Sequence, residues 1–584
     1  MSEGRINIQP QELTSFESKS LDSMPAISCI GSGSIGGKAS GLAFIEKTIA
    51  LYFDKKPFPG ISVSIPRFIV IATDYFDRFL DENDLRQSVG SNMSDEYIAH
   101  AFGQGKLPRD LIEKLQTFVR AVNIPLAVRS SSLLEDAMYE PFAGVYATKM
   151  IPNNQGDIET RLEKLKEAIK FVYASTFFKA ARDYHRAINR PTSDEKMAVI
   201  IQDIVGRQFN GRYYPDISGV ARSYNFYPMG SAKPEEGVVS LALGLGKTIV
   251  DGGQVWSYSP AYPRVNPPVG GAGELLKVTQ TKFWAVNMKK PSVTNPMHES
   301  EYLVREQLSE AEADGSLQYV ASTYRPQDDR IIMGAGVAGP RIITFSPILV
   351  GERIPLNGLL IDLLNLCEKK IRNEVEIEFA VSLKTTPELS AHLGFLQVRP
   401  MVVSDAIIDV TIDDMLSENT LVASDRAMGN GKNDSIKDIV YVNPEKFNAG
   451  ATRQIARELA LFNRKMVDDG LPYLLIGFGR WGSSDPWLGI PVNWGQISGA
   501  KAIVEATIPG MDVDLSQGAH FFHNMTSFRI SYFSVNHHGK YSIRWDWLRN
   551  QELVNESEFV RHVRLATPLM VRVDGRSGRG VILK

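Results

Sequence analysis

Apolar residues recur at helical spacing in several stretches of the chain. In residues 39–51, Leu42, Ile45 and Ile49 fall on one side of a helix and predict an apolar face that packs on a core. The longest stretch of this kind, residues 158–189, predicts a long amphipathic helix in the same way. Further helices are predicted at 299–313, 353–370 and 452–469.

Short runs of apolar and β-branched residues between these stretches predict buried strands. Residues 197–205 (Met-Ala-Val-Ile-Ile-Gln-Asp-Ile-Val) are one such run, and residues 126–129 are another that ends at a serine cluster. Residues 255–296 are rich in Pro, Tyr and Gly and predict irregular structure. Paired strands are predicted at 375–383 and 393–398. Helices and strands mixed in this way predict an α+β fold.

The chain has 584 residues, which is more than a single hydrophobic core usually holds. We therefore expect about two to four domains. Residues 1–24 are mostly polar and predict a tail or a linker, and the sequence changes character near residue 405. Residues 406–584 are accordingly predicted to form a separate α/β domain of unknown role.

Composition narrows the class of protein. The hydrophobic content of 43% and the formal net charge of -3 are ordinary for a soluble protein and give no electrostatic argument for nucleic-acid binding. The two cysteines exclude a disulfide framework and a cysteine-rich zinc site. The chain has no apolar run of about 20 residues and no signal-peptide pattern. We expect a cytoplasmic protein that binds neither membrane nor nucleic acid.

A glycine-rich run is the first candidate for binding chemistry. Residues 31–38 have the sequence Gly-Ser-Gly-Ser-Ile-Gly-Gly-Lys. A dinucleotide-binding fold would need an acidic strand end about 20 residues later, and Asp54 lies in a loop-like sequence instead. A Walker A loop is excluded because Ala39 follows Lys38. Two interpretations stay open: a flexible turn, or an amide-rich loop that places Lys38 as a cation for phosphate.

Arg129 lies where an apolar strand meets three serines. An arginine at a strand end can present its planar fork to phosphate oxygens. The alternative is an ordinary surface ion pair between Arg129 and Glu135 or Asp136.

Four polar residues alternate with apolar ones on the two predicted paired strands. Glu376 and Glu378 share one face of the first strand, and Gln397 and Arg399 share one face of the second. Two carboxylates on one face repel each other unless a cation or water lies between them. A solvated strand face is the alternative, but the four positions together suggest a floor for a polyphosphate and its metal ion.

These motifs resemble the N-terminal nucleotide-binding domain of pyruvate phosphate dikinase and phosphoenolpyruvate synthase, a domain that also occurs in rifampicin phosphotransferase. The resemblance covers about residues 26–405. It is most specific at 36–39 (Gly-Gly-Lys-Ala), at 127–144 (from Ala-Val-Arg-Ser-Ser to Phe-Ala-Gly) and at 396–400 (Leu-Gln-Val-Arg-Pro). It implies an ATP-grasp-like fold in which two α+β lobes, residues 25–205 and 206–405, clamp ATP.

The resemblance also implies a role for each matching residue. Lys38, Arg129 and Arg399 would be the catalytic cations, with Arg399 holding the transferring phosphoryl group. The remaining assignments are Gly144 and Thr148 over the phosphate and sugar, Gln202 near the base, and Glu378 and Gln397 on Mg²⁺. ATP itself is implied by the resemblance, whereas the residues alone indicate only a polyphosphate and a metal.

Two departures from the family pattern leave the acceptor open. Lys247 stands in Gly-Leu-Gly-Lys where the family usually has Gly-Leu-Gly-Glu, and none of the nine histidines lies in the family's phosphohistidine motif. The pyruvate-binding barrel is also missing, because too few residues follow position 405. The resemblance implies a Mg²⁺- and ATP-dependent phosphotransferase whose acceptor is unidentified, and a partner protein could supply the histidine. The alternatives are an ATP-binding regulatory or scaffold protein without transfer activity and a fragment of a longer dikinase-like protein.

The C-terminal region holds two further candidates. Residues 477–482 (Gly-Phe-Gly-Arg-Trp-Gly) predict either a second phosphate-binding turn with Arg480 or a tight turn with a packing tryptophan. His520 and His523 would share one face of a helix, where they could serve metal or phosphoryl chemistry, or they could be buried histidines. His520 is the best alternative phosphoacceptor that the sequence offers.

Overall fold

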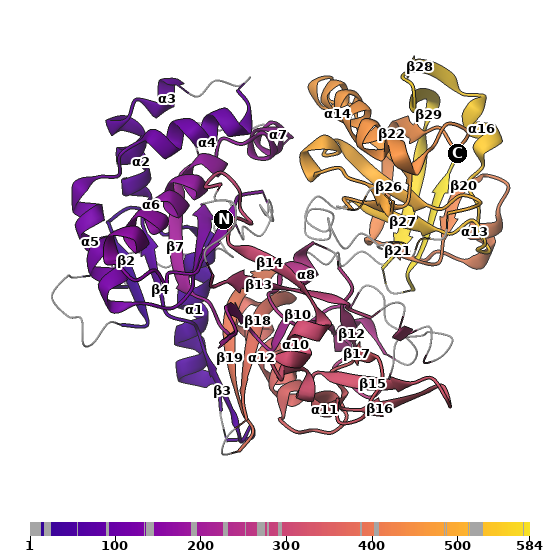
Figure 1. The fold of residues 1–584 in the computed structure, drawn as a ribbon. Helices are drawn as coiled ribbons and strands as arrows, with labels where there is room; N and C mark the ends of the chain where they lie inside the picture. Colours follow the sequence, from indigo (N-terminus) through magenta and orange to yellow (C-terminus); the bar gives the residue numbers. More distant parts are fainter. Residues whose placement is uncertain are drawn as a thin grey trace. The chain divides into compact units, whose positions relative to one another are not determined.

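The described part of the protein is a mixture of helix (31%) and strand (33%), which confirms the α+β prediction. The computed structural model describes residues 13–16, 25–54, 56–88, 93–132, 135, 145–187, 195–225, 232–251, 253–265, 272, 275–276, 279–289, 295–385, 388–401, 408–483, 485, 487–511, 513, 515, 530–575 and 577–584. These residues form two compact units, one made mainly of the chain up to Pro400 and one made mainly of Met401–Lys584 (Figure 1).

The first sheet of the N-terminal unit, sheet A, has the strand order β1-β2-β4-β7-β5-β6. In that order, the strands are Thr14–Ser15 (β1), Ile27–Ile30 (β2), Phe68–Ile71 (β4), Met197–Asp203 (β7), Leu126–Ser132 (β5) and Thr148–Ile151 (β6). β7 lies between β4 and β5, and its continuous apolar run suits a strand that is buried on both faces. β5 is longer than predicted because it continues through the serine cluster.

Helices were predicted at residues 39–51 and 158–189 in the same part of the chain, and the described residues contain further helices that were not predicted. The helix bounds are Gly36–Tyr52 (α1), Thr73–Glu82 (α2), Leu85–Ser88 (α3), Asp95–Gln104 (α4), Arg109–Ala121 (α5), Ile158–Ser175 (α6) and Lys179–Ala187 (α7). The single long helix predicted for residues 158–189 is wrong, because α6 ends at Ser175 and a separate helix, α7, follows. Both α6 and α1 bury their apolar faces.

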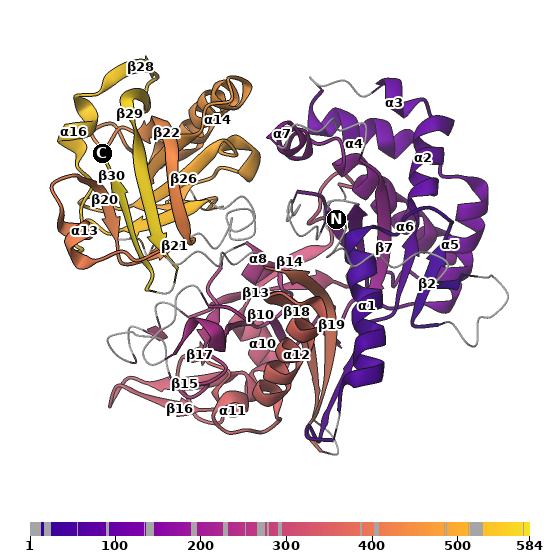
Figure 2. The same cartoon turned by 180° about the vertical axis from the view of Figure 1, so that it is seen from behind.

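The second sheet, sheet B, has the order β12-β11-β10-β18-β19-β3. In that order, the strands are Trp256–Tyr258 (β12), Val238–Ala242 (β11), Ile217–Arg222 (β10), Val375–Lys384 (β18), Ser390–Pro400 (β19) and Ile61–Ser64 (β3). β3 belongs by sequence to the predicted N-terminal lobe, yet it pairs in parallel with β19. α1 lies beside β19 in both views (Figures 1 and 2). Sheets A and B therefore share one hydrophobic core, which includes Ala39, Leu42 and Val398.

Smaller sheets complete the N-terminal unit. One has the order β14-β13-β9-β8 and the other β16-β15-β17. Their strands are Arg207–Phe209 (β8), Arg212–Tyr214 (β9), Lys282–Asn287 (β13), Leu303–Gln307 (β14), Ala321–Arg325 (β15), Arg330–Met333 (β16) and Arg341–Ile343 (β17). The helical segments here are Pro234–Glu236 (η4), Lys247–Val250 (α8), Leu308–Ala313 (α10), Ser316–Tyr319 (η5), Ser346–Leu349 (α11) and Leu356–Ile371 (α12).

Two predictions in this region are wrong. Residues 255–296 were predicted to be irregular, but they contain β12, which pairs with β11, and β13, which pairs with β14 and β9. Residues 299–313 were predicted to be one helix, but the first part of this stretch contains β14, which pairs with β13, and only Leu308–Ala313 is helical. In both cases, pairing between strands outweighed the local pattern.

The C-terminal unit is built on a sheet with the order β20-β30-β29-β22-β23-β26-β27-β21, and β28 pairs with β29 (Figure 2). Its strands are Thr420–Ser424 (β20), Ala427–Met428 (β21), Gly431–Val442 (β22), Tyr473–Phe478 (β23), Ala500–Ala506 (β26), Ser531–Val535 (β27), Glu552–Glu556 (β28), Val560–Asp574 (β29) and Arg579–Leu583 (β30). The short strands Arg480–Trp481 (β24) and Gly489–Ile490 (β25) pair separately. The helices are Ile412–Leu416 (α13), Ala449–Ala451 (η6), Thr452–Asp468 (α14), Trp494–Gln496 (η7) and Trp545–Arg549 (α16), and α14 confirms the helix predicted from residue 452.

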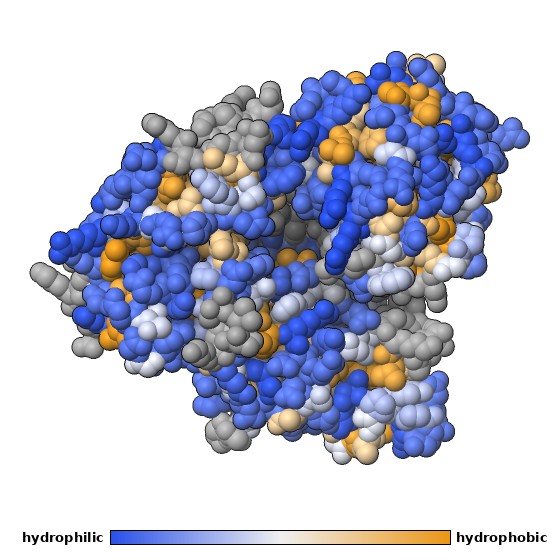
Figure 3. Space-filling view, turned by 45° about the horizontal axis from the view of Figure 1, so that its top comes forward, coloured by the Kyte–Doolittle hydropathy of each residue, from blue (hydrophilic) through white to orange (hydrophobic). Residues whose placement is uncertain are grey.

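The surface in Figure 3 is largely hydrophilic, with apolar residues in scattered patches. Among the described residues, no helix has both the length and the apolar character needed to cross a membrane.

Candidate active site

The glycine-rich turn before α1 is packed against the start of α2. The backbone N–H groups of Ser32 and Gly33 lie 3.2 and 3.1 Å from the two carboxylate oxygens of Asp74. The N–H of Ser34 donates to the hydroxyl of Thr73 at 2.9 Å. These amides are therefore bonded to the protein, which favours the turn over the amide-rich phosphate loop as the interpretation of residues 32–34.

The turn instead fixes where α1 begins. Gly36 has a φ of +74°, and a Cβ atom there would lie 1.8 Å from the carbonyl oxygen of Ser131 on β5. Only glycine allows both this backbone conformation and this close approach. The turn thus holds the first residues of α1 against the serine end of β5, and Lys38 lies in the first turn of that helix.

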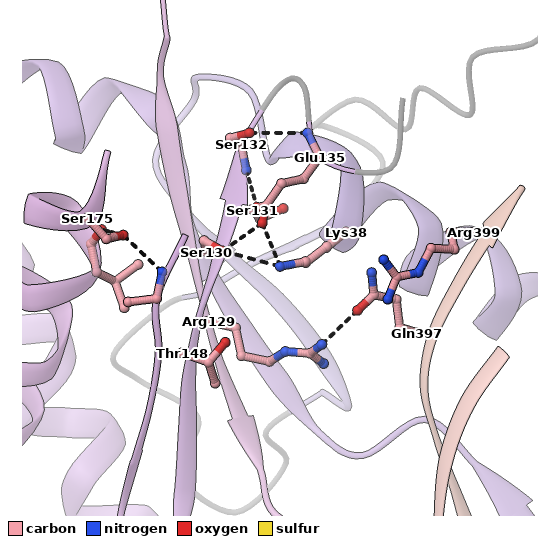
Figure 4. A network of polar contacts seen from close by, with 12 residues as sticks. Lys38, Arg129, Ser130, Ser131, Ser132, Glu135, Thr148, Ser175, Gln397 and Arg399 are labelled. Carbon is pink, nitrogen blue, oxygen red and sulfur yellow. Dashed lines mark hydrogen bonds and ion pairs between the residues drawn. The ribbon is translucent and has the colours of Figure 1, made fainter. Parts of the chain in front are cut away.

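Lys38 reaches a buried carboxylate (Figure 4). Its Nζ lies 2.6 Å from Oε1 of Glu135 and 3.2 Å from the hydroxyl of Ser130. The Glu135 side chain is 1% exposed, and it also accepts from the Ser130 hydroxyl at 2.8 Å and from the Ser132 N–H at 2.9 Å. Glu135 therefore pairs with Lys38 and not with Arg129, while Asp136, the other partner considered for Arg129, lies outside the described residues.

Arg129 extends from β5 in sheet A to β19 in sheet B. Its Nη1 donates to the backbone oxygen of Leu396 at 3.1 Å and to Oε1 of Gln202 at 3.3 Å. Its Nη2 donates to Oε1 of Gln397 at 2.7 Å and lies 3.7 Å from Glu378 (Figure 4). One guanidinium group thus contacts residues from three strands of the two sheets.

The carboxylates and cations of β18 and β19 face one another across the strand pair. The register places Glu376 opposite Arg399 and Glu378 opposite Gln397, which confirms the predicted pairing of the strands. Arg399 contacts Glu378 at 2.5 Å and Glu376 at 3.3 Å, and Arg222 holds the other oxygen of Glu376 at 2.6 Å. Glu376 was predicted as part of this charged floor but was assigned no ligand role of its own, and the structure shows it paired with two arginines.

Gln202 lies at the centre of sheet A, on β7. Its side chain is 2% exposed, and its Oε1 accepts from Arg129. Its Nε2 is buried and has no hydrogen-bond partner within the described part of the chain. Because a buried donor without a partner is costly, this N–H suits an acceptor atom on a bound ligand.

Thr148 lies directly opposite Arg129 in the pairing of β5 and β6. Its backbone N–H donates to Oε1 of Glu299 at 3.3 Å, so a carboxylate from a distant segment lies beside the predicted sugar-binding strand. Gly144, the other residue assigned to this end of the site, lies outside the described residues.

The lysine that replaces the family's usual glutamate has acidic and aromatic neighbours. Lys247 contacts Asp251 at 3.1 Å, and its Nζ lies 5.7 Å from the ring centre of Trp284. Burial raises the pKa of Glu299, while the positive charges of Lys247 and Lys38 act in the opposite direction. Lys247 is thus within electrostatic range of a carboxylate that comes from another part of the chain.

The donor atoms of Glu378 and Gln397 fit a magnesium ion that also binds phosphate. Among the described residues, no group of three or more His, Cys, Asp or Glu side chains could hold a metal ion by itself. Mg²⁺ commonly takes one or two protein oxygens and completes its coordination with phosphate and water. A carboxylate and an amide oxygen on facing positions of two strands provide that minimal set.

In the C-terminal unit, the Trp481 side chain packs into the sheet. It is 1% exposed, it fills the space beside Gly477, and its Nε1 donates to the backbone oxygen of Val504 at 3.1 Å. The glycine-rich turn here therefore has the packing tryptophan that one interpretation predicted. His520 and His523 lie outside the described residues.

Comparison with known families supplies the decisive observation. The model of the family described as "Pyruvate phosphate dikinase, AMP/ATP-binding domain" matches residues 32–420, more than half of the chain. The chain belongs to this family. The matched range contains Lys38, Arg129, Gln397 and Arg399, and it ends just after the start of the C-terminal unit.

Two curated proteins show weaker similarity to parts of the chain. An "Uncharacterized phosphotransferase YvkC" of Bacillus subtilis is 29% identical over 191 residues, which cover 32% of this chain and 20% of that protein. A "Phosphoenolpyruvate synthase" of Aeropyrum pernix is 25% identical over 239 residues, which cover 37% of this chain and 25% of that protein. The similarity therefore spans a quarter or less of each relative.

Proposed function

We propose that the N-terminal unit binds Mg²⁺-ATP between two lobes of an ATP-grasp-like fold, residues 25–205 and 206–405, and that the protein is a dikinase-like phosphotransferase. The observation that carries this proposal is the position of Arg129. It extends from sheet A and contacts Gln397 and Leu396 on sheet B, so ligand phosphates beside it would lie between groups from both sheets. Family membership supports ATP as the nucleotide.

The proposed roles follow from the charges that surround this point. Lys38 and Arg129 bind phosphate oxygens, and Arg399 holds the phosphoryl group that is transferred. Phosphoryl transfer has a loose transition state whose charge lies on the phosphoryl oxygens, so fixed cations are the main catalytic requirement. These cations contact Glu135, Gln397 and Glu378, respectively, and these contacts restrict the positions that each cation can take.

Gln202, Thr148 and Gly144 are proposed to contact the nucleotide away from the transferring group. The unsatisfied Nε2 of Gln202 supports a ligand contact at that atom. Glu378 and Gln397 would hold Mg²⁺, which would neutralise phosphate charge when bound. Their competing contacts with Arg129 and Arg399 imply that these side chains rearrange slightly as the metal and phosphates enter.

The acceptor of the phosphoryl group is unidentified. None of the nine histidines lies in the phosphohistidine motif of the family, so we propose that the acceptor is held by the C-terminal unit or is a histidine of a partner protein. The two cysteines are buried and form no disulfide, which is compatible with the reducing cytoplasm that we propose as its location.

Phosphorus NMR of the purified protein with Mg²⁺-ATP tests the function directly. The spectra would be recorded with and without pyruvate and with cell extract. AMP as product would indicate dikinase chemistry and a phosphohistidine on this chain or on a partner. ADP alone would indicate simple γ-phosphoryl transfer or hydrolysis.

A regulatory or scaffold protein that binds ATP without transfer is the second candidate. The observation that favours it is Lys247, which places a positive charge where the family usually has a glutamate. Unchanged ATP in every NMR sample, together with tight ATP binding measured by calorimetry, would support this candidate, and any phosphorylated product would exclude it.

A further inference from the structure

We propose that Glu135 is a positioning residue for nucleotide binding: it fixes the ammonium group of Lys38 so that one N–H points to the phosphates. This inference rests on the proposed function, because it assumes that the ligand of Lys38 is the phosphate chain of ATP. Its basis is the geometry of one carboxylate and its neighbours at the serine end of β5.

The carboxylate of Glu135 is held by the protein independently of Lys38. Oε1 accepts from the Ser130 hydroxyl at 2.8 Å, and Oε2 accepts from the Ser132 N–H at 2.9 Å. The N–H of Glu135 in turn donates to the Ser132 hydroxyl at 3.2 Å. Contacts to both oxygens leave the 1%-exposed carboxylate little freedom to rotate or to withdraw when a ligand enters.

The ammonium group, in contrast, is partly open. Lys38 is 13% exposed, and its Nζ contacts Glu135 at 2.6 Å and Ser130 at 3.2 Å. A lysine ammonium has three N–H donors. Within the described part of the chain, these contacts use two of them, which leaves the third for a ligand. A flexible four-carbon side chain is thus held in one direction before binding, which lowers the entropy lost on binding.

A competing idea is that Glu135 only neutralises Lys38 and gives way to phosphate. That idea would require the carboxylate to move or its negative charge to oppose the ligand. The contacts to Ser130 and Ser132 argue against movement, because breaking them would leave a buried carboxylate without its hydrogen bonds. The two ideas predict opposite changes in affinity when the carboxylate is replaced by an amide.

The test is calorimetric titration of the full chain with Mg²⁺-ATP, comparing wild type with Glu135→Gln. We expect the Kd of the variant to be about tenfold higher, which is the size of coupling measured between groups in direct contact. An unchanged or lower Kd would overturn the proposal. Glu82→Gln is the matched control, because Glu82 forms an exposed ion pair with Arg78 in the same unit, and its Kd should equal that of wild type.

A double-mutant cycle separates positioning through Lys38 from a general structural effect. In the Lys38→Met background, Glu135→Gln should change Kd less than about twofold, because its effect acts through the missing ammonium. A full tenfold effect in that background would contradict positioning. If Glu135→Gln does not fold, Ser130→Ala replaces it in the test, because it removes a hydroxyl that contacts both Lys38 and Glu135. Ser130→Ala should also raise the Kd for Mg²⁺-ATP. An unchanged Kd would overturn the proposal.

The titration also separates failure of this inference from failure of the proposed function. If wild type shows no Mg²⁺-ATP binding, the proposed function is wrong, and so is the role proposed for Glu135. If wild type binds and the Glu135 and Ser130 variants bind equally well, only the positioning role is wrong.

Discussion

Two lysine–glutamate pairs of nearly equal length lie beside β5 and β6, two neighbouring strands of sheet A, and they differ in their access to solvent. The Lys38–Glu135 pair is 2.6 Å long with side-chain exposures of 13% and 1%, and the Lys149–Glu301 pair is 2.7 Å long with exposures of 1% and 0%. The Lys38–Glu135 pair, called the open pair below, is partly exposed at its lysine. The Lys149–Glu301 pair, called the sealed pair below, is buried at both residues. Under the proposed function, the first pair serves a ligand, whereas the buried second pair serves the fold.

The sealed pair fastens a loop to the edge of sheet A. Lys149 on β6 also donates to the backbone oxygen of Pro296 at 2.5 Å and lies 5.1 Å from the ring centre of Phe171. Its side chain is 1% exposed, which leaves it little access to a ligand. It does hold the segment that brings Glu299 beside Thr148, and so it supports the site indirectly.

The largest contrast is expected when each lysine is replaced by methionine. Lys38→Met should lower the rate of ATP turnover per folded molecule by about 100- to 1,000-fold, the loss typical of removing one preorganised charge donor. Lys149→Met should lower it by only a few-fold, because the Lys149 side chain is buried. Phosphorus NMR of both variants at equal folded concentration would measure this, and equal losses would mean that the two pairs do not differ in role.

The second contrast concerns stability. Glu301→Gln leaves the ammonium of Lys149 buried without a carboxylate, which should lower the free energy of unfolding by about 3 kcal/mol. Thermal and guanidinium unfolding of the N-terminal unit would measure the change. Glu82→Gln at the surface is the control and should cost no more than about 0.5 kcal/mol. A Glu301 variant as stable as this control would contradict the structural role of the sealed pair.

A third experiment tests how the open pair is held in place by the backbone. Gly36→Ala should lower the free energy of unfolding by about 1–2 kcal/mol because of the positive φ alone. The new Cβ atom would also clash with the backbone of Ser131. The shift of α1 that removes this clash should displace Lys38 and weaken Mg²⁺-ATP binding. Unfolding and calorimetric titration would be measured together.

Gly103→Ala is the matched control for that substitution. Gly103 lies in α4, and a Cβ atom there would have nothing within 4 Å, so alanine should leave binding unchanged and raise stability by about 0.5–1 kcal/mol. If both alanine variants behaved alike, the close approach at Gly36 would not be what positions α1.

The smallest expected effect is a pH dependence of the sealed pair. Burial lowers the pKa of Lys149 below its ordinary value of 10.5, so between the folded-state pKa and 10.5 the unfolded chain binds more protons than the folded one. Stability from this group therefore increases as the pH rises toward 10.5 and is lost as the pH falls through the folded-state pKa.

The difference in unfolding free energy between wild type and Lys149→Met should accordingly shift in favour of wild type as the pH rises from 7.5 toward about 10.5. Denaturant unfolding of both proteins at several pH values would measure it. A difference that stays constant over this range would show that the pKa of Lys149 is not lowered by folding.

Local patterns predicted those elements whose burial follows from their own sequence. The spacing of Leu42, Ile45 and Ile49 predicted α1, and the alternation of Glu376 with Glu378 predicted a strand that pairs with the one carrying Gln397 and Arg399. Local pattern failed at β14, where an acidic stretch suited a helix but pairing with β13 made part of it a strand.

Long-range contacts account for the part of the site that the sequence could not supply. Glu135 is 97 positions from Lys38, and Glu299 is 151 positions from Thr148. Nothing in the neighbourhood of either residue indicates its partner, because each contact depends on how separate strands and loops pack. The turn at residues 31–34 shows the same limit, since only the packing of α2 determines that its amides bind Asp74 and Thr73.

By itself, the sequence determined the mixed α+β class, the helices α1, α12 and α14, the two charged strands and the family resemblance, because hydrophobic periodicity and short motifs are local properties. The tertiary structure alone decided which lysine is sealed and which is open, since burial depends on everything that packs around a side chain. It also decided that Arg129 reaches β19 and that Glu135 holds Lys38. Such contacts form only when the chain brings distant charges together in a low-dielectric interior, where each must find a partner.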